Sequence, residues 1–94
     1  MNKYMLILSD QSEVVLQELR EAVLQDLNPI SPTVLVILPH IVLFHHAGGL
    51  EQAAQSLKPH LSEHANWILI QIHRGFLGTV KLDRMIDLEK FFAS

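Results

Sequence analysis

The segment that most constrains the fold is Thr33–His46, TVLVILPHIVLFHH. Apart from Thr33, the Pro39-His40 interruption and the closing histidine pair, every residue in it is aliphatic or aromatic. A run this apolar does not lie on the surface of a water-soluble domain, and its β-branched residues favour buried strands near the centre of a sheet. We therefore expect the rest of the chain to cover this segment.

The Pro39-His40 interruption has two interpretations. The segment is either a hairpin with strands at 33–38 and 41–46, or one long strand bent at a bulge. Proline does not fit the positive backbone angles of two-residue hairpin turns, so a hairpin needs a slightly longer turn that absorbs Leu38 or Ile41. A single strand over this whole segment would be long for a small domain. The hairpin is therefore preferred.

The composition predicts one domain that associates with itself. The chain has 94 residues, enough for a single domain spanning 1–94 with one core. Apolar residues make up 49% and charged residues 18%, against about 25% charged in an ordinary soluble domain. So small a core does not bury this apolar excess, which predicts an interface, most simply a homodimer. The net charge of −3 lacks the basic footprint of a general nucleic-acid binder and leaves open only a local basic patch.

The residue types that are missing narrow the chemistry. The chain contains no cysteine, which excludes disulfides, thiolate metal sites and cysteine nucleophiles and is compatible with the cytoplasm. The N-terminal stretch lacks the small-residue cleavage site of a signal peptide. The apolar run at 33–46 is shorter than the roughly 20 residues that a membrane helix needs. We expect a soluble, cytoplasmic protein with no membrane partner.

The order of predicted elements indicates the fold. Asp10 and Glu13 have the spacing of a capping box, Asn28-Pro29 ends the helix they would begin, and Asp83 would cap the last helix. An α+β chain in the order strand, helix, strand, strand, helix, strand is typical of the ferredoxin-like βαββαβ sandwich, here with a C-terminal helix. The expected elements are strands at 3–8, 33–38, 41–46 and 67–73, helices at 12–27 and at 50–61 with a kink at Pro59, a short strand at 80–82, and a helix at 84–92.

This fold leaves one face of the sheet without helices. In the strand Trp67–His73, the residues Ile68, Ile70 and Ile72 alternate onto one face, and the other face is mixed. A sheet with helices on one side and a partner on the other fits this pattern. The sequence therefore predicts a homodimer that forms through the free sheet face.

Four short segments carry a resemblance to a known family. The first strand ends in Ile7-Leu-Ser-Asp10, and Leu57-Lys-Pro-His-Leu61 follows the second helix. The strand Trp67-Ile-Leu-Ile-Gln-Ile72 and the terminal helix Asp87-Leu-Glu-Lys-Phe-Phe92 complete the set. In this layout the chain resembles the SinR-like and GhoS-like relatives of the small CRISPR-associated dimeric, ferredoxin-like nucleases.

The resemblance implies a function for Asp10. It implies a homodimer in which Asp10 lies near the two-fold axis, binds Mg²⁺ with its symmetry mate and makes the protein a metal-dependent endonuclease acting on RNA or DNA. The chain departs from that pattern at Ser9, where an aromatic residue is usual, and in a second strand without basic residues. These departures favour the alternative, a non-enzymatic dimeric regulatory or protein-interaction module.

Histidines supply the remaining candidate site. The chain has six, and His40, His45, His46 and His73 would gather at a sheet face or dimer seam, where they would bind a metal or respond to protons near pH 6. The alternative is that each bonds to nearby backbone. Arg74, in a glycine-containing loop beside His73, is a candidate to hold a phosphate or stack on a base.

Overall fold

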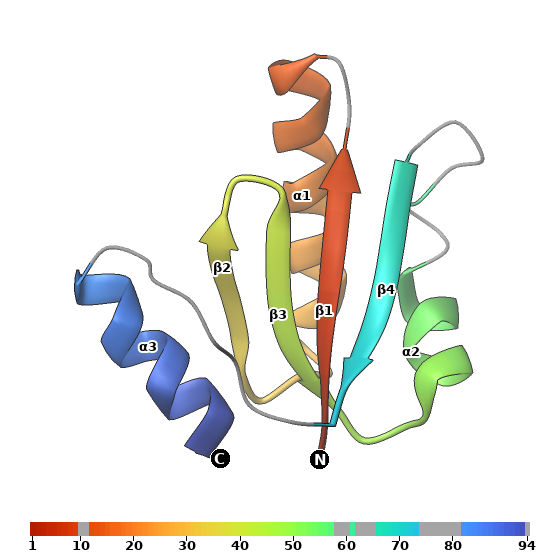
Figure 1. The fold of residues 1–94 in the computed structure, drawn as a ribbon. Coiled ribbons are helices and arrows are strands. Elements are labelled where there is room, and N and C mark those ends of the chain that lie inside the picture. The colour runs from red at the N-terminus through yellow and green to blue at the C-terminus, as the bar shows by residue number, and fades with distance from the viewer. Residues whose placement is uncertain (10–11, 58–60, 62–65, 74–81, 94) are drawn as a thin grey trace.

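The structure is a computed structural model that describes residues 1–9, 12–57, 61, 66–73 and 82–93. Its four strands form one sheet in the order β2-β3-β1-β4, and every neighbouring pair is antiparallel (Figure 1). The α+β class is therefore confirmed. The elements are β1 (Asn2–Ser9), α1 (Glu13–Leu27), β2 (Val34–Leu38), β3 (Ile41–His46), α2 (Leu50–Leu57), β4 (Asn66–Ile72) and α3 (Leu82–Ala93).

The central apolar segment is a hairpin, as predicted. The strands β2 and β3 pair antiparallel, with Val36 opposite Val42 and Leu38 opposite Ile41. The register shifts between Val36 and Leu38, so one extra residue of β2 is accommodated there. The expected longer turn does not form, since Pro39-His40 alone separates the paired residues. Proline cannot adopt the positive backbone angles of the common two-residue turns, and the bulge changes the backbone geometry of β2 just before this turn.

The ends of two helices differ from the prediction. The cap of α1 is Ser12, whose hydroxyl accepts the backbone N–H of Val15 at 3.4 Å. The expected capping box of Asp10 and Glu13 is therefore wrong, and Asp10 itself lies outside the described residues. Helix α3 begins at Leu82, so Asp83 lies within the helix rather than at its cap.

Other predictions near these ends have mixed outcomes. Residues 80 and 81 of the expected short strand lie outside the described part of the chain, and its last residue, Leu82, is helical. The kink expected at Pro59 also lies outside the described residues. Helix α1 ends at Leu27 directly before Asn28-Pro29, as predicted, and the N–H of Asn28 still bonds to the carbonyl of Leu24 at 2.9 Å.

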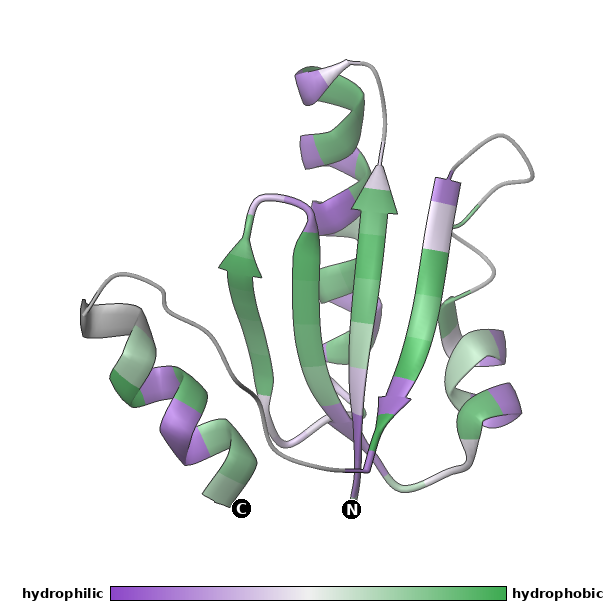
Figure 2. Cartoon of the chain, viewed as in Figure 1, coloured by the Kyte–Doolittle hydropathy of each residue, from purple (hydrophilic) through white to green (hydrophobic). Residues whose placement is uncertain are grey.

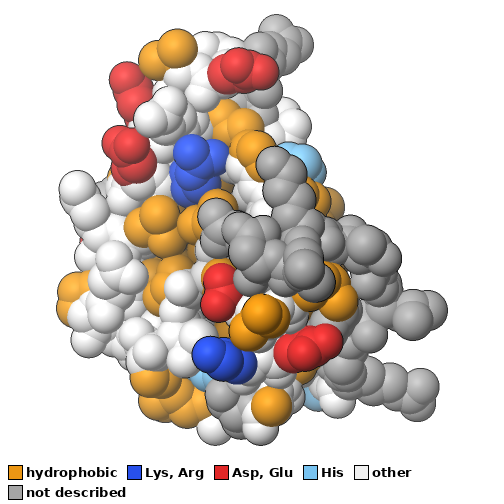
Figure 3. All heavy atoms as spheres, turned by 90° about the vertical axis from the view of Figure 1, so that its left-hand side faces the viewer, with side chains coloured by type: hydrophobic (Ala, Val, Ile, Leu, Met, Phe, Trp, Pro, Cys, Tyr) orange, Lys and Arg blue, Asp and Glu red, His pale blue; other side chains and the backbone are white. Residues whose placement is uncertain are grey.

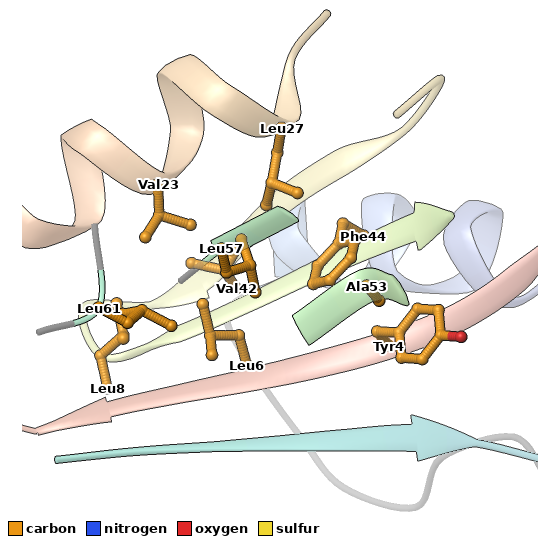
Figure 4. Packing of buried hydrophobic residues seen from close by; sticks show 10 residues of the cluster. All are labelled: Tyr4, Leu6, Leu8, Val23, Leu27, Val42, Phe44, Ala53, Leu57 and Leu61. Atoms are coloured by element: carbon orange, nitrogen blue, oxygen red, sulfur yellow. The ribbon is translucent and has the colours of Figure 1, made fainter. Parts of the chain in front are cut away.

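The main core lies between one face of the sheet and the helices α1 and α2. Alternate residues of β1 and β3 point to this face because successive side chains of a strand point to opposite sides. The strands are hydrophobic over most of their length (Figure 2). The core side chains of this face meet those of both helices (Figure 4). These residues are Tyr4, Leu6, Leu8, Val23, Leu27, Val42, Phe44, Ala53, Leu57 and Leu61.

The sequence had predicted that the opposite face carries no helix. This prediction is wrong for part of the face, because α3 packs on it. Leu88 and Phe91 of α3 form a buried cluster with Leu43 of β3. The helix lies beside β2 (Figure 1). Helix α3 has an apolar side, and it buries that side against the sheet face that α1 and α2 do not cover. Helix α3 therefore covers the β2–β3 half of this face and leaves the β1–β4 half less covered.

Candidate functional site

The four predicted binding histidines in the described chain do not form one cluster. His40 lies exposed in the β2–β3 turn, and His45 and His46 end β3 at the far end of that strand. His73 is exposed directly after β4. Since β3 separates His40 from the histidine pair, the structure brings His40 to the other end of the sheet. Arg74 lies outside the described residues.

His45 is buried under the last turn of α3. Its side chain is 4% exposed, and its Nε2 lies 3.2 Å from the carbonyl oxygen of Phe91. Its ring contacts that of Phe91 with centroids 4.4 Å apart and the two planes tilted by 36°. On the neighbouring strand, Lys3 Nζ donates to the carbonyl of Phe92 at 3.2 Å. Donors and positive charge are favourable at a helix C-terminus, where carbonyl groups lack helical partners. The two strands therefore fix the end of α3 to the sheet.

Burial lowers the pKa of His45 below its usual value. The carbonyl of Phe91 acts in the opposite direction, and the positive charges of Lys3 and the N-terminus lower the pKa further. A neutral imidazole carries one N–H, and here the nitrogen near Phe91 is placed to donate. His45 thus acts as a structural hydrogen-bond donor near neutral pH.

His46 points to the opposite face and joins β3 to α2. Its Nδ1 accepts the N–H of Gly48 at 2.8 Å, and its Nε2 lies 3.3 Å from Ser56 Oγ. Because Nδ1 is an acceptor, the proton of the neutral ring is on Nε2 and points to Ser56. The hydroxyl of Ser56 in turn donates to the carbonyl of Gln52 at 3.1 Å.

This polarity is opposite to that of a catalytic serine–histidine pair. In such a pair the histidine accepts the serine proton, and its other nitrogen donates to a carboxylate. Here His46 donates to Ser56 and accepts from the backbone of Gly48. Tyr4 and Asn2 add hydrogen bonds to the carbonyl of Gly48 at 2.7 and 2.9 Å. The whole arrangement fastens the loop after β3 to the sheet.

Metal binding at Asp10 stays a prediction. Within the residues that the structure describes, no group of three or more histidine or acidic side chains is close enough to hold an ion. Asp10 is not among those residues. In the same described ranges, none of the helices combines the length and the hydropathy needed to cross a membrane.

The feature that stands out on the second sheet face is an uncovered apolar surface. Ile7 of β1 lies opposite Ile68 of β4, and Met5 lies opposite Ile70. Ile68 is 59% exposed and Ile70 40%. The two β1 residues are partly buried, and Met5 also packs against the cluster of Leu43, Leu88 and Phe91, so the exposed part of this surface lies mainly over β4. We call Met5, Ile7, Ile68 and Ile70 the β1–β4 apolar face. The alternation of isoleucines in β4 had indicated a shared face, and the structure adds that Trp67 and Leu69 pack toward the helices instead.

Three comparisons, with protein-family models, with curated proteins and with solved structures, each returned no match for this chain. The resemblance to CRISPR-associated nucleases therefore stays a prediction, and the function is argued from the surface and the hydrogen bonds described above.

Proposed function

We propose that the protein is a non-enzymatic interaction module that forms a homodimer through the β1–β4 apolar face. The main observation in support is that Ile68 and Ile70 are exposed and lie beside Met5 and Ile7 on one face of the sheet. None of these four side chains carries a charge or a hydrogen-bond donor. Burying them would remove apolar surface from water, which stabilises association by about 25 cal/mol for each Å² buried.

A second copy is the occupant that suits this face. A two-fold interface places the same patch on both protomers, so the patch must complement itself. Four apolar side chains without charge meet that condition, because an apolar surface matches another copy of itself. The strand order β2-β3-β1-β4, with α1 and α2 on one face, supports our further inference that the fold is the ferredoxin-like sandwich. A chain without cysteine is compatible with the cytoplasm, where we place the dimer.

Light scattering coupled to size exclusion tests the dimer. We expect the wild-type protein at micromolar concentration to have twice the chain mass of 10.7 kDa. Ile68→Glu and Ile70→Glu each place a carboxylate in the interface and should give the mass of one chain. Val14→Glu is the matched control, because Val14 is 66% exposed but lies on α1. A monomeric wild-type protein, or a dimer that survives both isoleucine substitutions, would refute the proposal.

The nuclease hypothesis has a separate test. Labelled RNA and DNA would be incubated with the protein in the presence of Mg²⁺, Mn²⁺ or a chelator, with Asp10→Asn in parallel. A non-enzymatic module leaves all substrates intact under every condition. Cleavage that needs the metal and is lost in Asp10→Asn would establish the endonuclease and overturn the non-enzymatic assignment. No described residue supplies an observation that favours cleavage.

A further inference from the structure

The loop between β3 and α2, residues 47–49, is held in place by hydrogen bonds to its two glycines. Two side chains of β1 donate to the carbonyl of Gly48, and the N–H of Gly48 donates to His46 Nδ1 at 2.8 Å. The N–H of Gly49 donates to Gln52 Oε1 at 3.2 Å, which is one half of a capping box at the start of α2. Among these partners, only His46 has a side chain type that changes its charge between pH 5 and pH 8.

Gly48 lies close against the first turn of α2. A Cβ atom added at Gly48 would meet Gln52 Oε1 and would lie 2.8 Å from Gln52 Cβ, whereas one added at Gly49 would meet nothing within 4 Å. The same Gln52 side chain accepts the N–H of Gly49. The position of Gly48 is therefore coupled to the first turn of α2, so a change at the bond between His46 and Gly48 also affects the start of that helix.

A second proton on the ring of His46 is incompatible with this bond. The neutral ring carries its proton on Nε2, because Nδ1 accepts the N–H of Gly48. A second proton therefore binds Nδ1 and makes both ring nitrogens donors. Two N–H groups would then face each other across 2.8 Å, and the attraction would become a repulsion. Since His46 is only partly buried, solvent can supply the proton.

The groups packed against His46 in the described chain include no charged side chain that bonds to the ring. On β1, Asn2 pairs with His46, and the ring of Tyr4 is nearly perpendicular to the imidazole with centroids 6.3 Å apart. On α2, the partner of the ring is Ser56, and the acidic Glu51 is exposed in the first turn. Helix α3 lies on the other face of the sheet, on the side that Figure 3 shows, with acidic and basic side chains among hydrophobic ones.

The remaining titratable groups near this end of β3 are not acids. His45 and Lys3 are paired across β3 and β1, and both bond to the end of α3 on the opposite face. The N-terminal ammonium of Met1 precedes the residue that pairs with His46. His73 follows β4, and β1 separates that strand from β3. None of these groups supplies a negative charge that would stabilise a protonated ring.

We propose that His46 is a pH-dependent switch for the β3–α2 loop. The neutral ring holds the loop and the first turn of α2 on the sheet, and uptake of a second proton breaks the bond to Gly48 and opens both. The open loop leaves Nδ1 free to keep its proton, whereas the closed loop does not. A lower pH therefore increases the population of the open loop. The switch lies on the face of the sheet opposite the β1–β4 apolar face and does not depend on dimerisation.

Amide hydrogen exchange, followed by NMR at about pH 7.5 and about pH 5.5, tests the switch. The quantity compared is the protection factor, which removes the intrinsic effect of pH on exchange. We expect the protection factors of Gly48 and of Ala53, whose N–H closes the first turn of α2, to fall by about three- to tenfold, because a free imidazole gains its proton near pH 6.5. The N–H of Leu8 bonds to the carbonyl of His40 at the other end of the sheet, and its protection factor should fall less.

Matched variants assign the response to one nitrogen. His46→Asn keeps an oxygen that accepts the N–H two residues on but does not titrate, so the protection of Gly48 should stay the same at both pH values. Ser56→Ala removes the partner of Nε2 and leaves Nδ1 in place, so the response should persist. His45→Gln should also keep the response at Gly48, which separates the switch from the buried histidine under α3.

Three outcomes would overturn the switch. The first is a wild-type protection factor of Gly48 that is the same at both pH values. The second is a response in His46→Asn as large as that of the wild type, which would assign it to another titrating group. The third is a fall at Gly48 without one at Ala53, or with an equal one at Leu8, which would mean that the loop and the start of α2 do not open as one local unit.

Discussion

The contrast between His45 and His46 shows how position on a strand decides the role of a side chain. The two are adjacent in sequence, so they point to opposite faces of β3. His45 is buried against Phe91 of α3, and His46 bonds to Ser56 of α2. Each histidine therefore ties one helix to the same strand. The sequence had left two alternatives for these histidines, a metal-binding cluster or hydrogen bonds to nearby groups. The second is favoured for this pair, because their described hydrogen bonds are to backbone or hydroxyl groups.

The lowered pKa of His45 gives a pH dependence with a definite sign. In the unfolded chain the imidazole takes up a proton as the pH falls below about 6.5, whereas the buried ring stays neutral to lower pH. The unfolded state then binds more protons than the folded state. The free energy of unfolding therefore decreases as the pH is lowered through this window. Urea unfolding at about pH 7.5 and about pH 5.5 measures the loss.

Two variants isolate His45 in this experiment. His45→Gln replaces the ring with an amide that still donates a hydrogen bond but does not titrate, and we expect it to reduce the loss of stability at low pH. His40→Gln changes an exposed turn residue and should leave the loss unchanged. An equal loss in His45→Gln and wild type would contradict the assignment.

The elements differ in how far sequence could predict them. The hairpin and α1 depend on local signals, namely an apolar run, helical spacing and the break at Asn28-Pro29, and these fix their existence and type. The cap of α1 was misplaced because Asp10 and Ser12 are both good capping residues two positions apart. The isoleucines in β4 were correctly assigned to one face. The other, mixed face also carries large apolar residues, Trp67 and Leu69, so periodicity did not say which face meets the helices.

The contacts that place α3 on the sheet could not be predicted from local sequence patterns. The position of α3 depends on the bond from Lys3 to Phe92, which are 89 residues apart, and on burial of Leu43. An amphipathic pattern predicts that a helix buries one side without saying against what.

The packing of α3 can be tested at Phe91, which is 1% exposed. Phe91→Ala removes a buried aromatic ring and should lower the free energy of unfolding by about 3–5 kcal/mol, because transfer energy and packing are both lost. Ile86→Ala is the control on the same helix, since Ile86 is 53% exposed, and should cost less than about 1 kcal/mol. A Phe91→Ala cost as small as that of the control would mean that α3 is detached from the sheet in solution.

The two faces of the sheet are covered to different extents. One face is sealed by α1 and α2, half of the other is covered by α3, and the remaining β1–β4 apolar face is open. A second copy covering the open face would bury the apolar residues that α3 does not reach, which accounts for part of the apolar excess of the composition.

A homodimer makes stability depend on protein concentration. If two chains fold and associate together, each tenfold increase in concentration favours the folded dimer by about 1.4 kcal/mol per mole of dimer. The urea midpoint of the wild-type protein should therefore rise between micromolar and higher concentrations. In Ile68→Glu the midpoint should no longer depend on concentration, because the charge blocks association, whereas Val14→Glu should keep the wild-type dependence. A wild-type midpoint that is the same at every concentration would contradict the homodimer.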